Sequence, residues 1–150
     1  MIRPATLDDV DAIGRLLHAF NVEYGSPTPE PPQLAARFVT LLGKGDTSVL
    51  LSGEAPDAIA VMRFRDSIWS EALECYLAEL YVVPERRGQG IGRALLEAAI
   101  EHARERGADF MDLGTSEDDV AARALYESLG FVNREGGPDG PIAYHYEREL

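Results

Sequence analysis

The feature that most constrains the fold is a glycine-rich turn that joins an apolar strand to a long helix. Residues 80–93 read LYVVPERRGQGIGR, and Pro84 ends the apolar run before the glycines begin. A turn of this kind points unpaired backbone N–H groups and the positive end of a helix dipole at an anion. Three arginines and no carboxylate lie within residues 86–96. The sequence therefore predicts an anion-binding cradle at this turn.

The spacing of the glycines narrows the kind of anion. A dinucleotide-binding fingerprint needs Gly-x-Gly-x-x-Gly, but Arg93 stands where the third glycine should be. The only lysine, Lys44, does not stand in a phosphate-binding Gly-Lys-Ser/Thr motif, which disfavours a nucleoside triphosphate. The pattern that does fit is Arg-x-x-Gly-x-Gly at Arg87, Gly90 and Gly92. These mismatches weaken the hypothesis of a nucleotide-binding or redox α/β domain, although it stays open as an alternative.

The remaining chain indicates one α/β domain over residues 1–150, because this length is typical of a single domain. Helical spacing of apolar residues, β-type apolar runs and turn-forming clusters alternate along it. The loop at residues 25–32 carries four prolines and is expected to be neither helix nor central strand. The expected elements are, in order, a strand at 2–5, helices from 7 and at 33–42, and strands at 48–52, 58–65 and 74–83. A helix at 90–106, a strand at 108–114, a helix at 122–129 and strands at 131–135 and 142–149 follow.

Composition excludes several classes of partner and site. The formal net charge of −12 disfavours nucleic acid and anionic membranes as general partners. No apolar stretch is long enough for a membrane span, and the N-terminus lacks the character of a signal peptide. The single cysteine, Cys75, cannot form an internal disulfide, and no metal-binding spacing joins it to the three histidines. We expect a cytoplasmic protein without a metal site.

Two motifs together resemble the GCN5-related N-acetyltransferase (GNAT) superfamily. The first is the glycine turn at residues 87–92, and the second is LYESLGF at residues 125–131, which resembles the family's Leu-Tyr-x-x-x-Gly-Phe signature. The motifs lie about 40 residues apart, and the expected order of elements also matches the family. The resemblance implies the GNAT fold, an α/β architecture with a central, mixed but mostly antiparallel sheet. That sheet would have about seven strands, splayed between the fourth and fifth, and about four flanking helices.

The resemblance implies acetyl-CoA as the co-substrate of an acyl-CoA-dependent N-acetyltransferase. Its pyrophosphate would be held at the turn, with added charge from Arg86 or Arg87. The backbone of the preceding strand would hold the pantetheine arm near a β-bulge, and the N–H of Val82 would polarise the thioester carbonyl. The cofactor-binding residues implied in this way are Leu80, Tyr81, Val82, Arg87, Gly88, Gln89, Gly90, Ile91, Gly92 and Arg93.

Two residues are expected to move protons in direct attack of an amine on the thioester. Tyr126 lies in the second signature, and its phenol can donate to the departing thiolate. Glu79 is the leading base because it sits in an apolar strand beside Val82. Asp112 or an ordered water stays open as the base, and an ion pair with Arg63 or Arg65 would be a structural explanation for Glu79.

The acidic surplus suggests a small cationic amine as the acceptor, such as an aminoglycoside, a polyamine or an amino-acid-like amine. The resemblance implies that the acceptor enters opposite the coenzyme, against a wall formed by the first two helices and the last strands, and aromatic residues of this wall suit a cation. A protein or peptide N-acetyltransferase is one alternative, and a non-catalytic acyl-CoA-binding sensor is another. Pairing of residues 142–149 across a homodimer also stays open. The aromatic residues assigned to the wall are Phe20, Tyr24, Trp69 and Tyr144.

Overall fold

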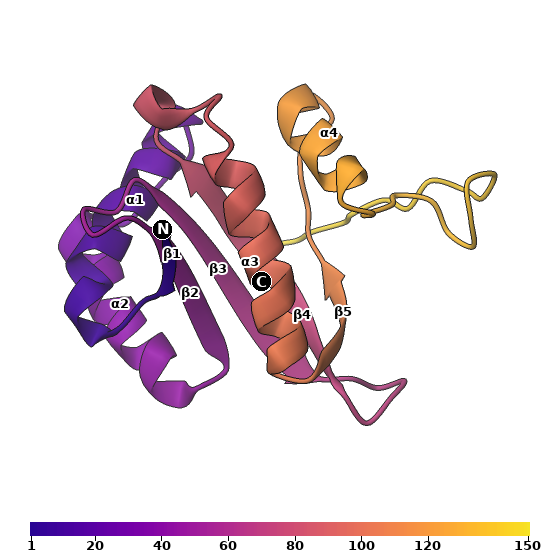
Figure 1. The fold of residues 1–150 in the computed structure, drawn as a ribbon, viewed down its shortest axis with the longest axis horizontal. Coiled ribbons are helices and arrows are strands. Elements are labelled where there is room, and N and C mark those ends of the chain that lie inside the picture. The colour runs from indigo at the N-terminus through magenta and orange to yellow at the C-terminus, as the bar shows by residue number, and fades with distance from the viewer. The chain divides into compact units, whose positions relative to one another are not determined.

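A five-stranded sheet forms the centre of the first of two units in the computed structural model, which describes all 150 residues (Figure 1). This unit comprises residues 1–111, and residues 112–150 form the second. The strand order follows the chain, with antiparallel pairing from β1 to β4 and parallel pairing of β4 with β5. The strands are β1 (Ile2–Pro4), β2 (Thr47–Ser52), β3 (Ala58–Asp66), β4 (Leu73–Val82) and β5 (Ala108–Asp112).

Three helices cover the sheet of the first unit: α1 (Val10–Glu23), α2 (Pro31–Lys44) and α3 (Ile91–Glu105). Apolar residues of α1 and α2 pack in one cluster with alternate residues of β2 and β3, such as Val49 and Val61. Because side chains alternate along a strand, the intervening residues face the other side, where α3 lies with Leu95 and Leu96 buried. No helix of the structure has the length and apolar character to cross a membrane.

Helix α2 begins two residues earlier than expected. Pro31 and Pro32 form its first turn, and the backbone N–H and side chain of Glu30 join a reciprocal capping box with Gln33. Proline is tolerated there because the first N–H groups of a helix have no partner within it. A 3-10 turn at Leu7–Asp9 precedes α1.

A β-bulge in β4 lies at the position that matters most for the site. Val61 of β3 pairs with Glu79, whereas the next residue, Met62, pairs with Leu77. Ala78 is therefore the extra residue, and it lies two residues before the stretch where a bulge was expected. Bulges re-aim neighbouring side chains. Here the bulge places Glu79 on the face of the sheet that α1 and α2 cover, opposite Val61.

The carboxyl end of β4 extends beyond β5. The N–H of Leu73 donates to the carbonyl of Gly107, so both strands begin at the same level, but β4 has ten residues and β5 has five. This difference leaves residues 80–82 without a β5 neighbour and agrees with the expected splay between the fourth and fifth strands.

The second unit contains α4 (Val120–Ser128) and an irregular hairpin. Asp119 caps the N-terminus of α4 by accepting a hydrogen bond from the N–H of Ala122 at 3.2 Å. The two last strands expected at 131–135 and 142–149 are not formed, because pairing is confined to one bridge between Arg134 and Ile142. Two backbone hydrogen bonds flank this bridge, from Glu135 to Pro141 and from Ala143 to Asn133, but no longer ladder forms, so the sheet has five strands instead of about seven.

Candidate functional site

The glycine turn presents helix N–H groups to open space. Gly88 and Gly90 adopt left-handed φ values of 75° and 80°, which favour glycine, and a Cβ atom at either would meet nothing within 4 Å. Gly90 is the N-cap of α3, and no side chain caps this helix. The first N–H groups of a helix have no acceptor within it, so those of Ile91 and Gly92 can bind an anion. The geometry fits the pyrophosphate of a coenzyme.

The arginines of the turn are less available than the sequence indicates. Arg86 pairs with Asp57 at 3.0 Å, Arg87 with Glu23 at 2.8 Å, and Arg93 with Glu97 at 3.1 Å. The local surplus of three positive charges is therefore balanced by carboxylates from the loop before β3, from α1 and from α3. Anion binding at this turn must rest mainly on the backbone N–H groups and the helix dipole.

Arg87 ties the turn to α1. Its Nε donates to the carbonyl of Val82 at 3.0 Å, and its guanidinium carbon lies 5.6 Å from the centre of the Tyr81 ring. The Tyr81 hydroxyl donates to Glu23 at 3.2 Å, and its ring stacks on Phe20 at 4.8 Å. The Arg87 hydrogen bond lowers the pKa of Glu23, while burial and Glu23 raise the pKa of Tyr81. Sequence reasoning missed this network, because 64 residues separate its two charged members.

The edge of β4 beyond β5 carries available backbone groups. The N–H of Val83 donates to the carbonyl of Asp57, on the β3 side. Since backbone groups of successive strand residues point to opposite edges, those of Leu80 and Val82 point away from β3. The carbonyl of Val82 is bound by Arg87, while its N–H remains directed toward the open edge. A ligand lying along this edge can accept hydrogen bonds from the strand.

Glu79 lines a cavity of about 200 Å³ between the sheet and the helices α1 and α2. Its carboxylate is half-buried, and burial raises the pKa of that carboxylate. Neither arginine considered as its partner forms an ion pair with it, because Arg65 pairs with Glu74, while Arg63 lines the same cavity without a salt bridge. An unpaired carboxylate in a cavity can accept a proton from a bound amine. Asn21, which sequence reasoning missed, also lines this cavity, one helical turn after Leu17.

The other sequence-predicted residues have varied surroundings. Tyr126 lies on α4 in the second unit, half-buried, with its ring edge-on to Phe131 at 6.0 Å. Asp112 ends β5 and is exposed. Of the aromatic residues assigned to the acceptor wall, Phe20 is packed against Tyr81 and Tyr24, whereas Trp69 and Tyr144 are largely exposed.

The chain belongs to the acetyltransferase (GNAT) family, whose model matches residues 15–131. This membership agrees with the fold and with the glycine turn described above. The match confirms the family that the two sequence motifs predicted, and it spans both of them.

Known relatives agree with this membership. The crystal structure of a putative acetyltransferase from Arthrobacter sp. FB24 is 42% identical, with a TM-score of 0.89 over 100% of this chain and 96% of that one. A mycothiol acetyltransferase from Thermobispora bispora is 48% identical over 66 residues, which are 42% of this chain and 22% of the relative. N-alpha-acetyltransferase 30 of Schizosaccharomyces pombe is 40% identical over 72 residues, 48% of each chain. The chain thus spans about a quarter or less of the mycothiol acetyltransferase.

Proposed function

We propose that this protein is an N-acetyltransferase that moves an acetyl group from acetyl-CoA to the primary amine of a small molecule. The observation that carries the proposal is Glu79, a half-buried carboxylate without an ion pair, in a cavity three residues before Val82. Membership of the GNAT family and the open glycine turn support the same conclusion.

The chain offers two backbone surfaces for the coenzyme. The N–H groups at the start of α3 would bind the pyrophosphate, with Gly88 and Gly90 leaving room for close approach. The outward backbone groups of Leu80 and Val82 would hold the pantetheine arm. Acetyl-CoA, when bound, supplies the acetyl group as a thioester with a thiol leaving group. Tyr81 is left without a contact to the coenzyme, because its backbone pairs with Ile59 of β3 and its side chain contacts Glu23 and Phe20.

Proton transfer is assigned to Glu79 and Tyr126. Burial raises the pKa of Glu79, which brings its basicity closer to that of the amine whose proton it receives. The N–H of Val82 would stabilise charge on the thioester oxygen as the amine attacks. The Tyr126 phenol would donate to the departing sulfur, a role that rests on its place in the family signature.

The cavity at Glu79 favours an amino-acid-like amine over the other acceptors. Glu79 would bind the ammonium group, and Arg63 of the same cavity would bind a carboxylate on the same molecule. A polyamine or an aminoglycoside has no anionic group that could pair with Arg63, so neither gains this second contact. The volume of about 200 Å³ lies below the usual range of about 300–1,000 Å³ for ligand sites, so the acceptor, or the part of it that enters, is small.

The test is a CoA-release assay with acetyl-CoA and a panel of amines: an ω-amino acid, its amide, a polyamine, an aminoglycoside and a short peptide. We expect turnover with the ω-amino acid and at least tenfold less with its amide. Arg63→Gln should remove this preference. Absence of turnover with every amine, together with saturable CoA binding, would support the non-catalytic sensor and refute the proposal.

A further inference from the structure

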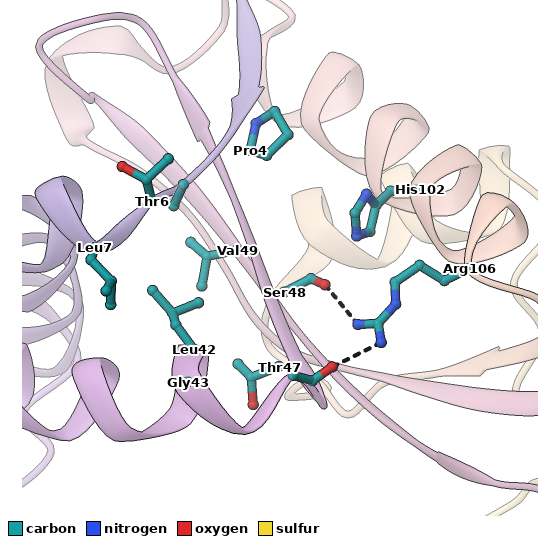
Figure 2. Close-up of a pocket in the computed structure, with 12 residues that line it drawn as sticks. Pro4, Thr6, Leu7, Leu42, Gly43, Thr47, Ser48, Val49, His102 and Arg106 are labelled. Atoms are coloured by element: carbon teal, nitrogen blue, oxygen red, sulfur yellow. Dashed lines mark hydrogen bonds between the residues drawn. The ribbon is translucent and has the colours of Figure 1, made fainter.

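A second cavity, of about 420 Å³, lies at the opposite end of α3 from the glycine turn. Figure 2 shows the His102 ring and the Arg106 guanidinium reaching from α3 toward β2, with Thr6, Leu7 and Leu42 on the other side. His102 follows Ile91 by eleven residues, which is roughly 16 Å along a helix axis. The cavity is therefore separate from the proposed coenzyme turn.

Two buried polar atoms of this cavity's residues have no hydrogen-bond partner within the chain. They are Nε2 of His102 and Oγ1 of Thr47, and the only other such side-chain atom in the structure belongs to Asp57. Buried polar groups are nearly always paired, so each exception requires an explanation. A ligand that bonds to these groups supplies one.

The charge of the cavity is opposite to that of the protein. Arg106 lines it, and no aspartate or glutamate does, although the chain has 26 acidic residues. Arg106 donates to Ser48 Oγ at 3.0 Å and to the Gly45 carbonyl at 2.8 Å, while its guanidinium carbon lies 4.3 Å from the centre of the Phe64 ring. It forms no salt bridge, and these two bonds use two of its five N–H donors.

A purely structural role for Arg106, linking α3 to β2, accounts for its two hydrogen bonds. It leaves the unpaired atoms of His102 and Thr47 unexplained, and it does not account for an apolar cavity beside them. Burial and Arg106 lower the pKa of His102, against a smaller opposing effect of Glu105, so its imidazole is neutral at pH 7. A neutral imidazole can present an N–H at Nε2.

We propose that this cavity binds a small monocarboxylate with a short apolar chain. The carboxylate accepts hydrogen bonds from the remaining N–H groups of Arg106 and, after a small rotation of the imidazole ring, from Nε2 of His102. The apolar chain packs against Leu7, Leu42 and Val49. The Thr47 hydroxyl, beside them, can complete the polar contacts after a small shift of the side chain.

The test is a titration of the 150-residue protein with butyrate, butyramide and butylamine, in which amide chemical shifts are followed at constant ionic strength. We expect saturable shifts at residues 47–49 and 102–106, with a Kd for butyrate at least tenfold below that for butyramide. Arg106→Gln should raise the butyrate Kd at least tenfold, because a charge-assisted pair is lost. Arg104→Gln, which removes an exposed arginine of the same helix, should leave it unchanged.

Gly43→Phe tests the cavity without removing any contact. Gly43 lines the cavity within α2, and a Cβ atom there would meet nothing within 4 Å, so the variant should fold. We expect it to weaken butyrate binding at least tenfold. Equal affinity for butyrate and butyramide, shifts confined to residues 88–93, or wild-type binding by Gly43→Phe would each overturn the proposal.

Discussion

Replacement of Glu23 by glutamine should lower stability and strengthen coenzyme binding at the same time. Glu23 pairs with Arg87 at 2.8 Å and accepts a hydrogen bond from Tyr81. Glutamine keeps the shape of the side chain and removes its charge. The Arg87 guanidinium, held at the glycine turn by Val82, then becomes available to a phosphate.

The structure sets the size of both effects. The Arg87 and Glu23 side chains are 42% and 28% exposed, so solvent screens their pair, and its loss should cost about 0.5–1 kcal/mol of unfolding free energy. The pKa of Glu23 is lowered in the folded state, so its contribution is full above the unfolded value of about 4.3 and is lost as pH falls through the folded value. The freed guanidinium should lower the Kd for CoA by about threefold to tenfold.

Urea unfolding at pH 7 and pH 3, with calorimetric titration of CoA, measures both quantities. The stability gap between wild type and Glu23→Gln should be larger at pH 7 than at pH 3, because protonation of Glu23 removes the charge that the pair needs. Glu101→Gln, which breaks a more exposed pair on α3, is the matched control and should change stability by a few tenths of a kcal/mol and leave CoA binding unchanged. Weaker CoA binding by Glu23→Gln would refute the reasoning, because Arg87 would then need Glu23 to be positioned.

Three further substitutions test the fold and the site. Gly14→Ala should destabilise the protein by about 1–3 kcal/mol in urea unfolding, because its Cβ would lie 2.4 Å from the carbonyl oxygen of Pro31 where α1 meets α2. Asp9→Asn should lose about 1–2 kcal/mol at pH 7 and much less at pH 2, because hydrogen bonds from Arg3 and from the backbone N–H of Thr6 lower the Asp9 pKa to about 2. Tyr126→Phe should reduce kcat at least tenfold with little change in CoA affinity, measured by CoA release and calorimetry.

Each of these outcomes has a contradicting result. Gly43→Ala, a helical glycine with open space around its Cβ, is the control for Gly14→Ala and should be neutral or stabilising by up to about 1 kcal/mol. Equal unfolding curves for the two alanine variants would refute the close helix packing. A pH-independent loss for Asp9→Asn would show that its ionisation is not linked to folding. Wild-type turnover by Tyr126→Phe would exclude the phenol as the acid.

Most helices and strands could be predicted from the sequence, because glycine and proline residues mark their ends locally. Pro84 ends β4, Gly90 starts α3, and Gly130 follows α4 in a left-handed conformation with φ of 90°. Glycine and proline act through their own backbone, so their effect can be predicted without knowledge of distant residues. The prediction of the last two strands was wrong. Strand pairing depends on a partner strand, and the apolar alternation at 142–149 does not reveal whether one is available.

The candidate site could be predicted only in part. The glycine turn is contiguous, and its geometry agrees with the prediction at Gly88 and Gly90. The charge of the turn was misjudged, because the carboxylates that balance Arg86 and Arg87 come from Asp57 and Glu23, distant in the chain. Pairing across the fold is set by tertiary packing, which the local pattern does not encode.

The position of Glu79 shows the same limit. Its placement in an apolar strand was visible in the sequence, but the bulge at Ala78 that directs it toward α1 and α2 was not located there. Arg63 was considered only as an ion-pair partner of Glu79, and the structure instead has both residues lining one cavity without a salt bridge. That arrangement is the observation on which we base the proposed amino-acid-like acceptor.

The most direct test of the central claim is the pH dependence of kcat for acetyl transfer to an ω-amino acid, in wild type and Glu79→Gln. Wild-type kcat should rise with pH as Glu79 loses its proton, with the midpoint above the ordinary glutamate value, because burial raises this pKa. Glu79→Gln should lose that rise and at least 100-fold in kcat while binding CoA normally. Glu74→Gln, on the same strand, should behave as wild type. Full activity with an unchanged profile in Glu79→Gln would contradict the assignment of Glu79 as the base.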